Sequence, residues 1–123
     1  MPPQLNASKP NSRARRRSVT SSGPASTVIL PAAGCEMPIP KIPAGREWSR
    51  VEKRRWNELW TSPQATQWDE TASGTVALLV SYASLLLSGQ GAAWIAQECR
   101  HASEALGLTP RSLLALNWQI SDQ

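Results

Sequence analysis

The sequence predicts an all-α fold: a small helical bundle of about five helices over residues 46–120, preceded by a disordered, basic and Pro-rich N-terminal arm. Apolar residues recur at helical spacing after Arg46. Ser62-Pro63 and Thr109-Pro110 read as caps followed by Pro at the first helical position. No segment shows the polar–apolar alternation of a half-buried strand. We therefore divide the chain into a disordered basic arm (1–27), a Pro-rich extended strap (28–45) and a helical domain (46–123).

Charge and aromatic content follow the same division. Residues 1–45 have a net charge of +5 and residues 46–123 a net charge of −1, while all six Trp follow Arg46. The arm has too few apolar residues to offset its ordering entropy. The strap prolines favour extended backbone, which can lie against a groove on its own or a neighbouring subunit. The core is therefore expected to come from residues 46–123 alone.

The first helix is predicted from about Glu47 to Trp60, with an apolar face and a basic face. Glu52 and Arg55 fall inside the apolar stripe, where they could pair with each other or meet opposite charges across a subunit contact. The apolar stripe consists of Trp48, Val51, Trp56, Leu59 and Trp60, and the basic face of Arg46, Arg50, Lys53 and Arg54.

Four further helices complete the predicted bundle. A short helix opened by Ser62-Pro63 reaches about Asp69, with Ala65 and Trp68 turned inward, and a third runs from Thr71 or Ala72 to Ser88. The third helix is apolar on nearly all sides, more than one small subunit can cover, which indicates assembly. The fourth spans about Ala92 to Leu106 before Gly107, and the last about Pro110 to Asn117, with Trp118 and Ile120 fixing the end. The predicted oligomer or core contacts are Trp48, Trp56, Trp60, Tyr82 and Leu86.

Catalysis has little support in the sequence. His101 is the single histidine, and no motif for a metal, a nucleophile or a phosphate loop accompanies it, so we expect no enzyme, cofactor or metal. Cys35 and Cys99 are interpreted as free thiols. The apolar stretch Val76–Leu87 is shorter than the roughly 20 residues that span a bilayer, so no membrane is expected.

Two basic features suggest a polyanionic partner. The arm carries Arg13, Arg15, Arg16 and Arg17, which can neutralise phosphates without ordering much else, and the basic face of the first helix could extend this surface. A solubilising tail and an ordinary solvated helix face are the alternatives. The turn before the last helix is also compatible with helix–turn–helix binding, but Arg111 is the only basic residue of that helix, which favours packing.

Several segments together resemble the small terminase subunits of tailed bacteriophages, especially those of phages of high-GC hosts. Pro38-Ile-Pro-Lys-Ile-Pro43 leads into Trp48, and Trp56-Asn-Glu-Leu-Trp60-Thr-Ser-Pro-Gln-Ala65 follows. Gly89, Leu106-Gly-Leu-Thr-Pro-Arg111 and Leu116-Asn-Trp118 complete the similarity, which covers about residues 38–120. The ten Arg against three Lys and the absence of Phe agree with GC-rich coding.

The resemblance implies a non-enzymatic DNA-packaging protein in the host cytoplasm. Such a subunit would bind double-stranded viral DNA at the packaging-initiation site, form a homo-oligomeric ring, and deliver DNA to the large terminase subunit that holds the ATPase and nuclease. Leu113, Leu114 and Leu116 stand where basic residues are common in the family, which shifts the expected DNA contacts to the arm and the first helix. The alternative function is a non-enzymatic protein–protein interaction module or another phage structural or regulatory component.

Overall fold

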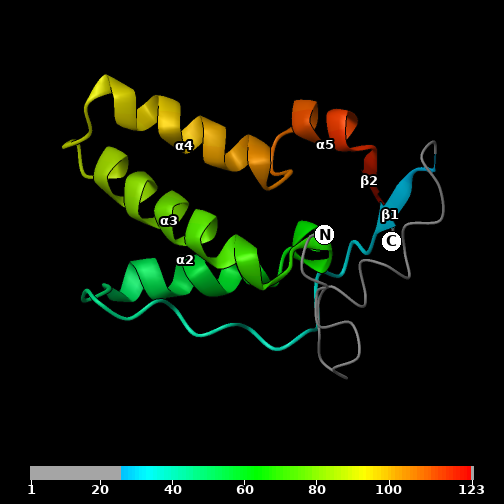
Figure 1. Cartoon of the computed structure of the whole chain (residues 1–123), viewed down its shortest axis with the longest axis horizontal. Helices are drawn as coiled ribbons and strands as arrows, with labels where there is room; N and C mark the ends of the chain where they lie inside the picture. The colour runs from blue at the N-terminus through cyan, green and yellow to red at the C-terminus, as the bar shows by residue number, and fades with distance from the viewer. Residues whose placement is uncertain (1–25, 123) are drawn as a thin grey trace, which may run out of the picture.

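The computed structural model describes residues 26–122 and is mostly helical (Figure 1). Three helices, α2, α3 and α4, lie side by side, and a two-stranded sheet stands at the far end from the α3–α4 turn. The elements in order are β1 (Val28–Leu30), α2 (Arg50–Trp60), the 3₁₀ helices η1 (Pro63–Gln67) and η2 (Glu70–Ala72), α3 (Ser73–Leu87), α4 (Ala93–Ala105), α5 (Pro110–Leu116) and β2 (Trp118–Ile120).

Indole rings from α2 and from the residue after η1 form the centre of the core. Trp56 and Trp60 are one helical turn apart, with ring centroids 5.7 Å apart, and Trp60 meets Trp68 edge-on at 5.2 Å. Val76, Leu79 and Val80 of α3, each at most 4% exposed, belong to the same cluster. Edge-to-face rings add about 0.5–1.5 kcal/mol per pair to the burial itself. Trp56 and Trp60 therefore lie in the core of the single chain, and a contact of either residue between subunits stays a prediction.

Local capping chemistry fixes the helix ends. Ser49 caps α2 and forms a capping box with Glu52, so the helix begins at Arg50 rather than at the predicted Glu47. Thr109 caps α5 before Pro110, as expected. Gly107 follows α4 with φ +75°, a left-handed residue that ends the helix. A Cβ at Gly107 would overlap the Trp118 ring, so this position needs glycine for space as well as for backbone conformation.

The all-α, five-helix prediction is wrong in two respects. The segment after Pro63 is a five-residue 3₁₀ helix that ends where Trp68 becomes extended, which leaves four α-helices in residues 26–122. Val28–Leu30 and Trp118–Ile120 pair as parallel strands, with Val28 N donating to Asn117 O at 2.9 Å. Three-residue strands are too short to show alternation, and the pairing joins segments 90 residues apart. No local pattern could reveal it.

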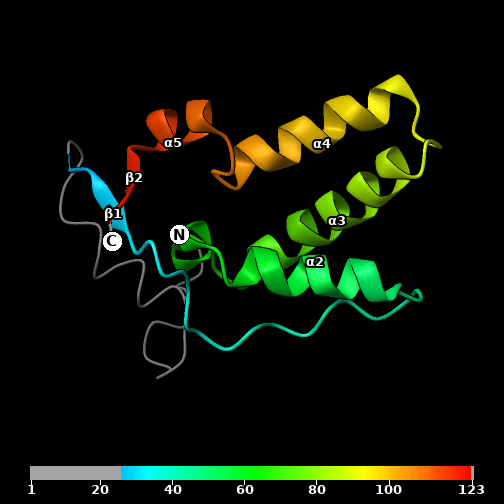
Figure 2. The ribbon, with the colours of Figure 1, turned by 180° about the vertical axis from the view of Figure 1, so that it is seen from behind.

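The strap contributes to the core, contrary to the expectation that residues 46–123 form it alone. Leu30 is fully buried and Cys35 is 6% exposed. The main-chain nitrogen of Cys35 donates to Thr61 O at 3.0 Å. After a turn at residues 31–34, the strap runs along α2 without regular secondary structure, as both ribbon views show (Figures 1 and 2). The groove that receives the strap therefore belongs to its own chain.

The apolar stripe predicted for the first helix is partly wrong. Val51 is 64% exposed, whereas Glu52, one residue later, is only 5% exposed. Glu52 turns inward because its carboxylate accepts from the Ser49 main-chain nitrogen and from Arg46. In the first turn of α2, capping and ion pairing therefore determine that Glu52 faces the interior, although Val51 is the more hydrophobic residue.

Candidate nucleic-acid interface

Three cations share one exposed face of α2. Arg50, Lys53 and Arg54 are all exposed, and their spacing of three and four residues places them side by side, away from the buried face of Trp56 and Leu59. No ion pair within residues 26–122 involves these three side chains. We call this surface the α2 basic face. Its charges are therefore not neutralised by neighbouring carboxylates of the described chain.

A lysine of the strap joins this surface. Lys41 and Lys53 line the same groove of about 310 Å³ between the strap and α2, together with Asn57. The apolar walls of the groove come from Ile39, Pro40, Ile42 and Trp56. Sequence reasoning placed Lys41 in the strap but did not connect it with the first helix. Its only sequence signal is a cation flanked by the two Ile-Pro pairs that keep the strap extended.

Two indole N–H groups set the position of the strap. Trp56 Nε1 donates to Pro40 O and Trp48 Nε1 to Pro43 O, each at 2.8 Å. These bonds hold the strap carbonyls on either side of Lys41 against the start of α2. Trp48 is half-buried here, so it supports the strap rather than the centre of the core.

Arg46 lies in a different environment from the other predicted cations. Its guanidinium donates to both carboxylate oxygens of Glu52, at 3.0 and 3.1 Å, and lies 4.0 Å from the centroid of the Trp48 ring. It also donates to Ser81 Oγ of α3. Arg46 therefore joins the end of the strap to both α2 and α3, and this group of side chains is called the Arg46 clasp below. A DNA contact by Arg46 stays a prediction.

The remaining predicted charges are now placed. Glu52 pairs with Arg46, and Arg55 pairs with Glu58 at 3.4 Å, so the two charges of the predicted apolar stripe do not pair with each other. The arm residues Arg13, Arg15, Arg16 and Arg17 lie outside the described residues. On α5, Arg111 is exposed and Leu114 is 83% exposed, so this seven-residue helix presents mostly apolar surface to solvent.

A comparison with protein families connects this architecture to phage DNA packaging. A family model described as phage terminase small subunit matches residues 6–122, nearly the whole chain. The chain belongs to this family. No curated protein and no solved structure matches it. Terminase small subunits are in general non-catalytic, and the resemblance read from residues 38–120 is confirmed at the level of the family.

The His and Cys side chains of this terminase small subunit can now be placed. Within residues 26–122, no group of three or more His, Cys, Asp or Glu side chains lies close enough to hold a metal ion. His101 is on the surface of α4, where its Nδ1 lies 3.8 Å from a Glu98 carboxylate oxygen. Within residues 26–122, Cys35 and Cys99 form no disulfide. Burial raises the pKa of the Cys99 thiol, against the opposing effect of the Arg55 guanidinium.

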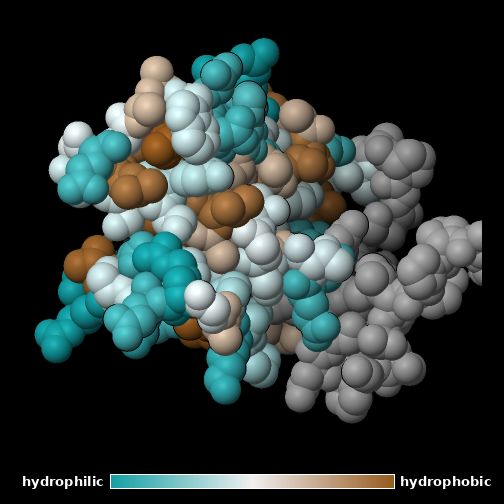
Figure 3. Space-filling view, turned by 60° about the vertical axis from the view of Figure 1, so that its left-hand side comes forward, coloured by the Kyte–Doolittle hydropathy of each residue, from teal (hydrophilic) through white to brown (hydrophobic). Residues whose placement is uncertain are grey.

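A second surface of this terminase small subunit is apolar and uncharged. In α3, Leu78 is 51% and Leu85 38% exposed, and at the α3–α4 turn Leu87 is 88% and Trp94 57% exposed. Tyr82 is half-buried and meets Trp94 edge-on, with ring centroids 6.0 Å apart, and Leu86 is half-buried beside Gly91. Figure 3, which brings this end forward, shows brown apolar residues on its surface above the hydrophilic side chains of the lower part, where α2 lies. We call Leu78, Leu85, Leu87 and Trp94 the hairpin patch.

One helical stretch is long and apolar enough to cross a membrane by length and composition alone. It runs over Glu70–Leu87, with a mean hydropathy of 1.3 and 17% of its residues buried. It reaches 18 residues only by including η2, which begins with the exposed Glu70. The helix α3 itself has 15 residues, fewer than the roughly 20 that a bilayer requires.

Proposed function

We propose that this protein is the DNA-recognition subunit of a phage packaging terminase. It binds double-stranded viral DNA at the packaging-initiation site and delivers the DNA to the large subunit, which supplies the ATPase and nuclease. It acts in the host cytoplasm and has no catalytic centre of its own. The observation that carries this proposal is the α2 basic face, an exposed group of cations that form no ion pair within residues 26–122, on a member of the terminase small-subunit family.

Phosphate contacts are the chemistry that this surface supports best. Arg50, Lys53 and Arg54 offer donors on a rigid helix, and Lys41 adds a fourth cation beside Lys53. Such a surface positions a duplex through its backbone, and the arm arginines add further phosphate contacts. Site selection would then come from several subunits acting together.

Assembly into a homo-oligomeric ring is supported by the hairpin patch. Residues 71–97 contain no charged side chain, so a second copy can approach this surface without repulsion or desolvation of ions. Leu78, Leu85, Leu87 and Trp94 expose apolar area on α3 and at the start of α4, and exposed apolar area on a small domain is typical of interaction surfaces. The hairpin patch and the α2 basic face consist of different residues on different helices, so one surface can assemble subunits while the other binds DNA.

Titration of a fluorescent duplex over a salt series tests the proposal. Each lost phosphate contact should lower the slope of log affinity against log salt by about 0.9. The variant Arg50→Gln/Lys53→Gln/Arg54→Gln should therefore lower the slope by about two to three and weaken binding of any duplex sequence to a similar extent. Arg100→Gln is the matched control, because Arg100 is an exposed arginine on α4 that lies near Glu104.

The outcome separates DNA packaging from the alternative function. If the triple variant and the control bind duplex equally, the α2 basic face has no role in DNA binding. If the unaltered protein ignores duplex at low salt but remains oligomeric, the protein–protein interaction module is favoured, since the exposed hairpin patch alone accounts for it. A stable monomer in solution, measured by mass, contradicts the ring.

A further inference from the structure

A closed ring of more than two copies needs two different contact surfaces on every copy, because each copy meets one neighbour on either side. The hairpin patch supplies one of these surfaces in the proposed assembly. If the hairpin patch bound its own equivalent on a second copy, the product would be a dimer that could not grow further. A ring therefore requires a second surface, elsewhere on the same chain, that fits the hairpin patch.

The strongest candidate for the second surface lies on α5 and β1. Among the large hydrophobic side chains of residues 26–122, the two highest exposures are those of Leu87 in the hairpin patch, at 88%, and Leu114 in α5, at 83%. Ile29 of β1 is 56% and Leu116 of α5 is 40% exposed. These residues belong to one end of the molecule, because β1 pairs with β2, which follows α5 after a single residue. We call Ile29, Leu114 and Leu116 the α5 patch.

The hairpin patch and the α5 patch lie at opposite ends of the molecule. In both ribbon views, the α3–α4 turn is at one end of the long axis, and α5 with the strand pair is at the other (Figures 1 and 2). Two surfaces in this arrangement can join copies head to tail. Neither surface includes a residue of the α2 basic face.

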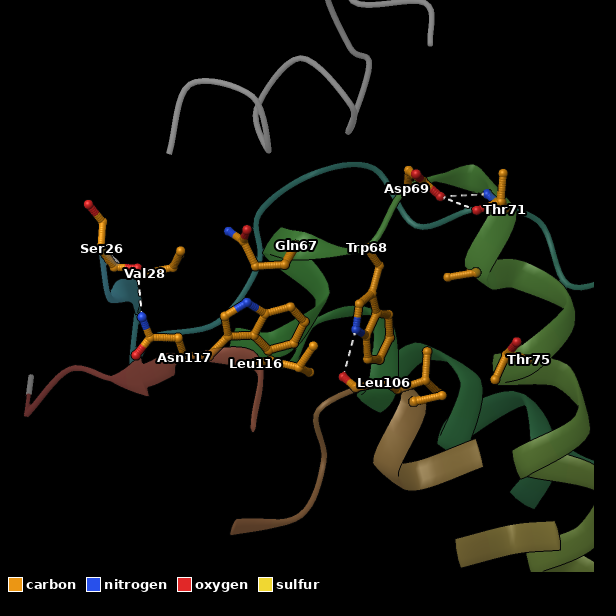
Figure 4. Close-up of a pocket in the computed structure, with 13 residues that line it drawn as sticks. Ser26, Val28, Gln67, Trp68, Asp69, Thr71, Thr75, Leu106, Leu116 and Asn117 are labelled. Carbon is orange, nitrogen blue, oxygen red and sulfur yellow. Dashed lines mark hydrogen bonds between the residues drawn. The ribbon is translucent and has the colours of Figure 1, made fainter. Parts of the chain in front are cut away.

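Hydrogen bonds hold α5 in place at both ends. Asn117, which ends α5 in the left-handed conformation, donates from its Nδ2 to Ser26 O at 2.9 Å (Figure 4). At the start of α5, the Thr109 hydroxyl accepts from the main-chain nitrogen of Ser112 at 3.1 Å. A partner that contacts Leu114 therefore meets a helix that is already ordered, which lowers the entropic cost of association.

The two patches are complementary in charge. The helical part of the α5 patch, like the hairpin patch, lies in an uncharged segment, which runs over residues 112–121. At the borders, Glu98 follows Trp94 by four residues on α4, and Arg111 precedes Leu114 by three residues on α5. Both charged residues are exposed, and these spacings place each on the same helix face as its apolar neighbour. An acid beside one patch and a base beside the other favour contact between the two patches over contact of either patch with itself.

We infer that the hairpin patch of one copy binds the α5 patch of the next, and that repetition of this contact closes the ring. The partner of each surface is thus a second copy of this chain, which presents the other surface. The inference rests on the ring in the proposed function, but it is independent of DNA binding. Since the α2 basic face takes no part in the contact, one phosphate-binding surface is repeated on every subunit of the assembly.

Mixing of two variants tests the contact by mass in solution. Leu87→Lys alters the hairpin patch and Leu114→Lys alters the α5 patch, and both positions are so exposed that the fold, checked by circular dichroism, should persist. A charge placed in an apolar contact should weaken association by about a hundredfold, so each variant alone should be a monomer of 13.4 kDa. The mixture retains one intact contact, between the α5 patch of Leu87→Lys and the hairpin patch of Leu114→Lys. It should therefore form dimers of twice that mass and nothing larger.

Val51→Lys is the matched control for both variants. Val51 is 64% exposed on α2 and belongs to neither patch, so this variant should assemble like the unaltered chain. A mixture that stays monomeric at a concentration at which the unaltered chain is assembled overturns the inference. Normal assembly of Leu114→Lys also overturns it and leaves the proposed ring standing, whereas a monomeric unaltered chain refutes the ring itself. Duplex titration of the monomeric variants tests DNA binding separately from assembly.

Exchange of the two border charges tests which surfaces face each other. Glu98→Arg and Arg111→Glu should each weaken association by about tenfold, because each change brings like charges together across the contact. Glu98→Arg/Arg111→Glu in one chain restores opposite charges, so its association should return close to that of the unaltered chain. If the double variant is weakened by the sum of the two single effects, the hairpin patch and the α5 patch do not face each other.

Discussion

Replacement of Glu52 by alanine tests whether the Arg46 clasp fixes the strap to the bundle. Glu52 is 5% exposed, and its carboxylate accepts from the Ser49 main-chain nitrogen at 2.9 Å. Both carboxylate oxygens also accept from Arg46 Nη2, at 3.0 and 3.1 Å. Loss of the reciprocal cap costs about 1 kcal/mol. The side chain of Arg46 is 45% exposed and can rehydrate, so the ion pair adds only about 0.5–1 kcal/mol.

The expected loss for Glu52→Ala is therefore about 2 kcal/mol in the free energy of unfolding. In a domain of this size, that lowers Tm by roughly 8–16 °C, which thermal unfolding followed by circular dichroism would measure. Glu58→Ala is the matched control on the same helix. Glu58 pairs with Arg55, and both side chains are more than half exposed, so its loss should stay within about 0.5 kcal/mol. Equal melting temperatures for the two variants would refute the account of the clasp.

Two further outcomes follow from burial. Trp56→Ala should cost about 3–5 kcal/mol in the free energy of unfolding by urea titration, because the ring is 2% exposed and contacts Trp60; a near-neutral result would mean that the orientation of α2 is wrong. Cys99 should react slowly with iodoacetamide at pH 8, because its raised pKa keeps the thiol protonated, and its rate should climb only at higher pH than that of an exposed cysteine. Denatured protein supplies the reference rate, and an identical pH profile in the folded state would contradict the assigned effect of burial.

Helix positions were predictable from the sequence because their signals are local. Thr109-Pro110 begins α5, and Gly107 ends the helical run before it. The face of Arg50, Lys53 and Arg54 was also predictable, since helical spacing alone brings these residues together. Their contact with DNA, the role of Tyr82 and Leu86 between subunits, and the division into arm, strap and helical domain stay predictions.

The remaining features depend on contacts between distant segments. The β1–β2 pair joins residues 90 positions apart, and the burial of Leu30 and Cys35 follows from where that pair places the strap. Lys41 lines the same groove as Lys53 because two indole N–H groups bind strap carbonyls on either side of Lys41. The inward orientation of Glu52 could not be predicted, because it depends on the ion pair that Arg46 forms with it. Hydropathy periodicity contains none of this information.

The parallel pairing of residues 28–30 with residues 118–120 makes the described chain nearly circular. Deleting residues 118–122 would also remove the strand that pairs with residues 28–30, so a truncation at the C-terminal end would destabilise the start of the described chain. A tag or fusion partner at either end of the chain would lie near this strand pair, at the same end of the molecule. In a ring with cyclic symmetry, every copy would present Ser26 and its last described residues on the same rim, away from its own α3–α4 turn.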